Sequence, residues 1–172
     1  MQRSVKLLVF NAIIAALYAA LTAFLPALTY GPVQFRFGEA LTILPMLIPT
    51  GYIGIAVGCL VANLFSPFGP WDVVIGTLVT FVAGLLTSRI KNPWLAALPP
   101  VLLNAAVLPL VWLLAQNDAA YLLNAGSMLL SQSAVLYFLG VPLYFALKKA
   151  IPNTLANLQP QKREDDQTPP KK

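Results

Sequence analysis

The chain has 172 residues, of which 58% are hydrophobic, and only 17 carry a charge (11 Lys or Arg and 6 Asp or Glu). Seven of these charges lie between Lys162 and Lys172, so positions 1–161 hold only ten, far below the roughly 25% charged residues of an ordinary soluble domain. So few polar groups cannot cover the surface of a soluble fold. The composition therefore predicts an all-α integral membrane protein with several transmembrane helices.

The residue inventory also argues against several kinds of chemistry. The chain has no histidine, which is the commonest general base and metal ligand, and its single cysteine, Cys59, cannot form an internal disulfide or a zinc knuckle. It has no GxxxxGK[ST] motif, so it cannot hydrolyse ATP by that route. We therefore expect no enzyme, metal or cofactor. The net charge of +5 does not indicate nucleic-acid binding, because almost all basic residues flank apolar runs or lie near the C-terminus.

The apolar runs predict helices, in chain order, over residues 5–27, 39–49, 51–65, 72–89, 93–115 and 125–148. We interpret the first as a retained span, because its apolar stretch, Leu7 to Leu25, exceeds the roughly 7 to 15 residues of a signal-peptide core. Residues 40–65 would also suit one span of 26 residues. The sequence Pro49-Thr50-Gly51 favours a turn there instead, and hence two short helices.

Charge placement supports six crossings rather than five. With six, and the N-terminus inside, ten of the eleven basic residues lie on the inner side and only Arg36 lies outside. The positive-inside rule thus predicts that both termini are cytoplasmic. Residues 1–150 would form a six-helix membrane domain, and residues 151–172 a disordered polar cytoplasmic tail. Because the second and third helices are short for a hydrocarbon core of about 30 Å, we expect protein or a cavity to cover their ends.

Four ionisable residues fall on the predicted outer side: Arg36, Glu39, Asp72 and Asp118. Arg36 and Glu39 are three residues apart, so they would form a structural salt bridge at a helix start. The alternative is a ligand site, since charges at membrane depth usually face a cavity. Asp72 is most simply an N-cap, and Asp118 a solvated turn.

Three primary amides lie within the predicted helices, at Asn63, Asn104 and Gln132. An unpaired amide in hydrocarbon is costly, so each needs a partner. Hydrogen bonds between helices would supply one. Together with Glu39 and aromatic residues such as Trp71 and Trp112, the amides would equally suit a neutral heteroaromatic ligand.

Small residues form stripes on several predicted helices. Gly54 and Gly58 on the third helix are expected to serve packing. On the first helix, alanines form a smooth face: Ala12, Ala16 and Ala20, with Ala15 and Ala19 alongside. This face would either pack inside the bundle or dock a partner protein.

Several of these segments together resemble a known family. They are VQFRFGEALTILP (residues 33–45), ANL (62–64), WDVVIGTL (71–78) and LPPVLLNA (98–105). Over about residues 5–150, and without the tail, the chain resembles the QueT family of queuosine-precursor substrate-binding (S) components of energy-coupling-factor (ECF) transporters. The resemblance implies a six-helix bundle in the bacterial cell membrane that binds a micronutrient near the outer face.

The resemblance also implies partners and a ligand. An Ala-x-x-x-Ala face on the first helix would dock to a transmembrane coupling subunit driven by two cytoplasmic ATPases. The ligand would be a 7-deazaguanine. Glu39 would accept N–H bonds from its guanidine-like edge, and Asn104 or Asn63 would complement its carbonyl group. Trp71 or Phe35 would stack on its ring, and Asp72 would pair with an aminomethyl cation if the ligand carries one.

Three alternatives stay open at this stage. One is an S component for another vitamin. The second is a small membrane-embedded transferase, which would need paired acids with a metal or a cationic phosphate cradle; Arg36 alone is a poor start for one. The third is a structural membrane protein without a ligand, which predicts that Glu39 and Asn104 tolerate apolar replacement.

Overall fold

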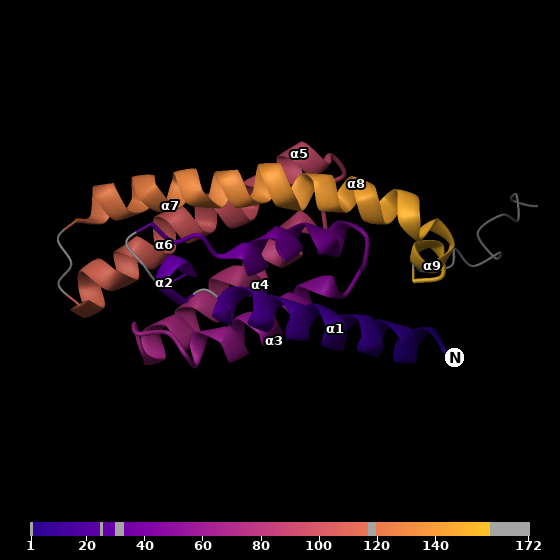
Figure 1. The fold of residues 1–172 in the computed structure, drawn as a ribbon, viewed down its shortest axis with the longest axis horizontal. Helices are drawn as coiled ribbons and strands as arrows, with labels where there is room; N and C mark the ends of the chain where they lie inside the picture. Colours follow the sequence, from indigo (N-terminus) through magenta and orange to yellow (C-terminus); the bar gives the residue numbers. More distant parts are fainter. Residues whose placement is uncertain (1, 25, 30–32, 117–119, 159–172) are drawn as a thin grey trace, which may run out of the picture.

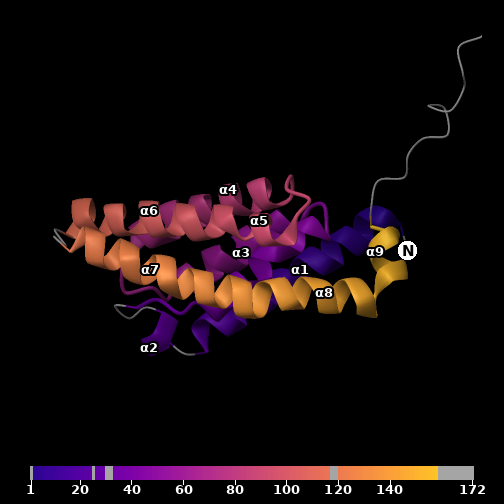
Figure 2. The ribbon, with the colours of Figure 1, turned by 90° about the horizontal axis from the view of Figure 1, so that it is seen from above.

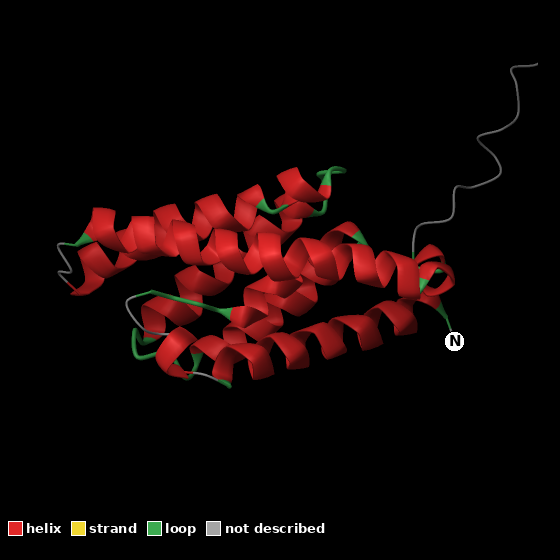
Figure 3. Ribbon diagram, turned by 45° about the horizontal axis from the view of Figure 1, so that its top comes forward, coloured by secondary structure: helices red, strands yellow, loops and turns green. Residues whose placement is uncertain are grey.

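The computed structural model describes residues 2–24, 26–29, 33–116 and 120–158. Asp118 and residues 159–172 of the predicted tail lie outside these ranges. Within them the regular structure is helical and contains no strand (Figure 3), which confirms the predicted all-α class. In the described part of the chain, three helices are long and apolar enough, by length and composition, to cross a membrane: Arg3–Ala23, Pro93–Leu114 and Tyr121–Ala150.

The helices follow one another closely along the chain. In order they are α1 (Arg3–Ala23), α2 (Pro26–Thr29), η1 (Phe37–Met46), α3 (Gly51–Asn63), η2 (Asp72–Gly76), α4 (Thr77–Thr87), α5 (Pro93–Ala96), α6 (Leu98–Gln116), α7 (Tyr121–Val135), η3 (Leu136–Gly140), α8 (Val141–Ala150) and α9 (Pro152–Ala156). The six predicted helices are all present, but η1 is a 3₁₀ helix, and η2 and η3 are π-helical turns within longer helices. The predicted helix 5–27 ends earlier, at Ala23, and α2 follows separately.

The centre of the bundle is occupied by η1. All residues from Gly38 to Pro45 are buried, and η1 packs against α1, α3, α4, α7 and α8. The chain then turns at residues 47–50 before α3 begins, which confirms two short helices rather than one span. Protein thus surrounds the short helix, as required for a segment too short to cross the bilayer alone.

Helices α1 and α3 pack closely against each other. A Cβ atom added to Gly54 would lie 2.6 Å from the backbone oxygen of Asn11, and one added to Gly58 would lie 2.7 Å from that of Ala15. Only glycine fits at these two crossing points. The predicted packing role of this glycine stripe is confirmed.

This contact separates the alanines of α1 into two rows. Ala15 and Ala19 are half-buried, on the side of α1 that meets α3, whereas Ala12, Ala16 and Ala20 are exposed. The structure therefore distinguishes the two rows that the sequence left equivalent. The exposed row is the one that remains available to a partner.

The two ends of the described chain lie at the same end of the bundle. Figure 1 places the N-terminus beside α9, and Arg3 Nε donates a hydrogen bond to the Leu158 carbonyl oxygen at 3.1 Å. α2 lies at the opposite end in both Figure 1 and Figure 2. A chain with an even number of membrane crossings has both termini on the same side. The number six and the cytoplasmic location of the termini stay predictions. The predicted tail starts with α9, and Leu155 and Leu158 are buried in the core.

Candidate functional site

Two groups of interacting polar side chains lie around η1. We call Arg36, Asp72, Ser66 and Asn63 the ion-pair cluster, and Tyr18, Glu39 and Asn104 the Glu39 cluster. We call a buried polar atom open where the described part of the chain supplies no hydrogen bond to it. Buried polar atoms in folded proteins nearly all have a partner, so open atoms mark places where water or a ligand is expected.

The ion-pair cluster joins the segment before η1 to the start of η2. Arg36 Nη2 donates to Asp72 Oδ2 at 2.8 Å, and each side chain is only 1% exposed. Ser66 Oγ donates to the same carboxylate oxygen at 2.7 Å. Asn63 Nδ2 donates to the Asp72 backbone oxygen at 2.8 Å. Opposite charges are thus compensated inside the bundle, which leaves Asp72 Oδ1 and Asn63 Oδ1 open in the described structure.

Two sequence-based interpretations are corrected by this cluster. Arg36 forms its salt bridge with Asp72 instead of Glu39, because Arg36 precedes η1 with extended backbone (φ −88°, ψ 95°) and does not share a helical face with Glu39. Asp72 is not an N-cap: its own N–H donates to the Gly69 carbonyl oxygen, and Trp71 precedes it in helical conformation. Its carboxylate binds the guanidinium, a stronger partner than a backbone N–H.

The Glu39 cluster brings together α1, η1 and α6. Glu39 is fully buried, and Tyr18 Oη donates to its Oε1 atom at 2.5 Å. Asn104 lies close enough to interact with the Glu39 carboxylate. Within the described residues, however, Glu39 Oε2 and both amide atoms of Asn104 are open. An unpaired buried polar group costs about 1–3 kcal/mol, and a charged one more.

The face of α6 that carries Asn104 meets the face of α7 that carries Gln132. Asn104, Leu108 and Trp112 follow one another at intervals of four along α6, as Met128 and Gln132 do on α7. Leu108, Trp112 and Met128 pack in one apolar cluster. Gln132 is therefore on the side of α7 that faces α6, with Oε1 open in the described part of the bundle.

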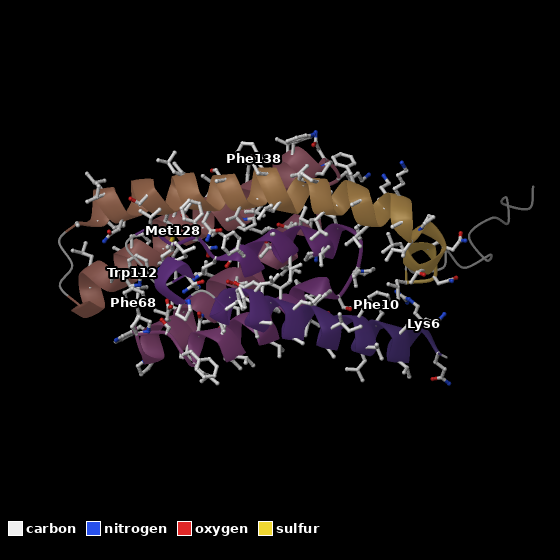
Figure 4. The ribbon with its side chains drawn as sticks, in the orientation of Figure 1. Lys6, Phe10, Phe68, Trp112, Met128 and Phe138 are labelled. Atoms are coloured by element: carbon white, nitrogen blue, oxygen red, sulfur yellow. The ribbon has the colours of Figure 1, made fainter. Side chains whose placement is uncertain are left out.

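An aromatic pair lies toward the end of this interface. Phe68 stacks on Trp112 with ring centroids 4.7 Å apart and an interplanar angle of 18°. In Figure 4, Phe68, Trp112 and Met128 lie at the end of the bundle opposite Lys6. Flat apolar side chains thus lie on the same face of α6 as Asn104, two helical turns further along the helix.

Not every predicted site residue joins the Glu39 cluster. Trp71 is 53% exposed and faces outward, where it lines an apolar crevice of about 200 Å³ with Ile75, Val111 and Leu114. Its ring is thus largely exposed, and the predicted stacking role stays a prediction. Asn63 belongs to the ion-pair cluster.

Two buried residues were missed by the sequence analysis. Tyr18 is fully buried among the alanines of α1, and its position in an apolar helix was a usable signal, because a buried tyrosine hydroxyl needs a partner. Gln34 is 1% exposed, and both atoms of its amide are open as far as the structure describes the chain. It lies within the family-like segment 33–45 but gave no periodic signal.

Comparisons with known proteins agree with the resemblance. A family model described as QueT transporter matches residues 8–149. The queuosine precursor transporter QueT of Lactococcus lactis subsp. cremoris (strain MG1363) is 40% identical over 89 residues, which make up 48% of this chain and 52% of that protein. The similarity thus spans about half the length of that relative. No solved structure matches the chain.

Proposed function

The chain belongs to the QueT transporter family, and from that membership we propose that it is the S component of an ECF importer for a queuosine precursor. The family match and the long apolar helices make it a multi-pass protein of the bacterial cell membrane. In this proposal it binds its ligand near the outer face and performs no chemistry on it. A coupling subunit with two cytoplasmic ATPases supplies the energy.

The observation that carries the proposal is the set of open atoms on Glu39 and Asn104. Asn104 Nδ2 is a donor, whereas Asn104 Oδ1 and Glu39 Oε2 are acceptors. The base edge of a 7-deazaguanine presents one acceptor, its carbonyl oxygen, and two donors, its ring N–H and its amino group. One donor and two acceptors complement that edge.

The remaining predicted residues take supporting parts in this proposal. Gln132 and the Phe68–Trp112 pair would contact the ligand from α7 and from the aromatic side, because they share the α6–α7 interface with Asn104. Arg36 and Asp72 already bind each other. They would therefore hold the segment between α1 and η1 in place, and Asp72 would not be free for a ligand cation.

The exposed alanine row of α1 is the proposed docking face. Ala12, Ala16 and Ala20 leave a smooth strip on which a partner helix can pack closely. Replacing Ala16 with Leu should prevent assembly with the coupling subunit and abolish uptake, while ligand binding by the isolated chain is unchanged. Leu at Ala146 is the matched control, since that alanine is also exposed but lies on α8 and not on the docking face. Normal assembly of Ala16→Leu would place the docking face elsewhere.

The binding test uses the purified chain in detergent. Saturable binding of a 7-deazaguanine precursor is expected, and riboflavin, thiamine and biotin should not compete. Glu39→Gln should weaken binding by about 10- to 100-fold, because a hydrogen bond to a charged group is worth about 1.5–3 kcal/mol. Competition by one of the vitamins would indicate another S component, and no saturable binding by a folded chain would leave only a structural role.

A further inference from the structure

The Tyr18 side chain forms a hydrogen bond with one of the two carboxylate oxygens of Glu39. Its hydroxyl donates to Oε1 at 2.5 Å, in the range of charge-assisted O–H···O⁻ bonds. Oε2 receives no hydrogen bond from the described residues. The two oxygens of the same carboxylate therefore differ: one is held by the protein and the other is open.

The position of Tyr18 is fixed by two glycines. A Cβ atom added to Gly58 on α3 would lie 2.7 Å from Tyr18 Cβ. One added to Gly38, next to Glu39 in η1, would lie 3.3 Å from Tyr18 Cγ and 2.8 Å from the Tyr18 backbone oxygen. Backbone thus packs against the tyrosine from two elements. The hydroxyl has little room to move, and so it can hold the carboxylate in one orientation.

A carboxylate that is free on both sides can accept two parallel N–H bonds from a guanidine-like edge. Glu39 has only Oε2 open, and Asn104, which lies within reach of the same carboxylate, has both amide atoms open. We propose that Tyr18 is a specificity-determining residue: by holding Oε1, it aims Oε2 at the amino group of the base, so that Glu39 and Asn104 read the base edge together. This inference rests on the function proposed above.

The first test measures a selectivity ratio. The affinity of the wild-type chain is measured for a 7-deazaguanine and for the matching 7-deazahypoxanthine, which lacks only the amino group, and the ratio of the two affinities is the selectivity. Loss of that group leaves Oε2 unpaired and should weaken binding by about 10- to 100-fold. In Tyr18→Phe the carboxylate can turn, so the selectivity for the amino group should fall to within about threefold, mainly through weaker binding of the deazaguanine.

The matched control is Tyr144→Phe. Tyr144 is also buried, but it lies on α8 against Phe145 and remote in sequence from the site. The selectivity ratio of the Tyr144→Phe variant should equal that of wild type. If Tyr18→Phe lowers the affinity for both bases by the same factor, or changes neither, then Tyr18 does not determine specificity and the inference is overturned.

A second pair of variants tests the same inference without relying on Tyr18→Phe alone. In Glu39→Gln the Tyr18 hydroxyl should hold the new amide oxygen, which turns the amide N–H₂ toward the base. A donor then replaces an acceptor, and the preference should change from the deazaguanine to the 7-deazaxanthine, which carries a carbonyl group where guanine carries its amino group. Adding Tyr18→Phe should remove this preference, because the amide can then turn.

The results separate this inference from the proposed function. A folded wild type that binds neither the deazaguanine nor the deazahypoxanthine overturns both. A wild type that binds the deazaguanine selectively, with the preference unchanged in Tyr18→Phe and not changed toward deazaxanthine in Glu39→Gln, overturns the inference alone.

Discussion

The ion-pair cluster and the Glu39 cluster both hold buried charged side chains in the same bundle, but they are paired differently. In the first, Arg36 and Asp72 compensate each other at 2.8 Å, and Ser66 adds a further donor. In the second, Glu39 meets the hydroxyl of Tyr18, while Asn104 has no hydrogen bond from the described residues. Open atoms occur in both clusters, since Asp72 Oδ1 and Asn63 Oδ1 are open as well. What differs is the charge, because Asp72 has Arg36 as its counter-ion, whereas no salt bridge to Glu39 is formed within the described residues.

The largest expected effect is on the ion-pair cluster. Arg36→Met leaves the Asp72 carboxylate buried without its counter-ion, which should lower the free energy of unfolding by about 3–5 kcal/mol. The melting temperature of the purified chain in detergent measures this loss. Combining Arg36→Met with Asp72→Asn removes the uncompensated charge and should restore much of the stability. If the double variant is as unstable as the single one, the salt bridge is not the source of the effect.

A second substitution acts on the Glu39 cluster through packing. Gly58→Ala places a methyl group against Tyr18 and Ala15, so we expect a loss of about 1–3 kcal/mol of stability from overpacking. Ligand binding should weaken too, because Tyr18 is pushed from its position beside Glu39. Gly126→Ala is the control, since an added Cβ there meets no atom within 4 Å. Equal melting temperatures and affinities in the two variants would contradict the close contact.

The sequence predicted features that depend on local pattern. The turn at Pro49-Thr50-Gly51 and the all-helical class followed from turn chemistry and apolar runs, and the structure confirms both. The packing role of Gly54 and Gly58 was predicted as well. Family membership followed from the segment around Glu39.

Pairings between residues far apart in the chain could not be predicted from the sequence. Arg36 and Asp72 are 36 positions apart, and only the packed bundle decides that Arg36 binds Asp72 in preference to its neighbour Glu39. The separation of the α1 alanines into buried and exposed rows depends on where α3 crosses, and hence on the glycines of another helix. Tyr18 has no motif of its own, because its role arises from a partner in η1.

A smaller effect is expected from Ser66→Ala. This change removes one hydrogen bond to Asp72 Oδ2 but leaves the bond from Arg36 in place. The free energy of unfolding should fall by about 1 kcal/mol, as for a typical hydrogen bond, and ligand affinity should not change. Thermal unfolding and binding measured on the same preparation check both points. A loss of affinity as large as that of Glu39→Gln would mean that the ion-pair cluster also binds the ligand.

The smallest expected effect on stability is that of Asn104→Leu, whose side chain has the same number and branching of heavy atoms, with methyl groups in place of the amide oxygen and nitrogen. Both amide atoms of Asn104 are open in the described structure, so the change breaks no hydrogen bond within those residues and removes the cost of a buried unpaired amide. Stability without ligand should therefore be equal to that of wild type or higher. Binding of the 7-deazaguanine should nevertheless fall by at least about tenfold, because two of the three groups that face the base are lost. Melting temperatures with and without ligand measure both quantities, and a structural amide would give the opposite pattern. If ligand-free Asn104→Leu is destabilised by more than about 1 kcal/mol, Asn104 has a hydrogen-bond partner within the protein. The contrast between the two clusters would then be lost.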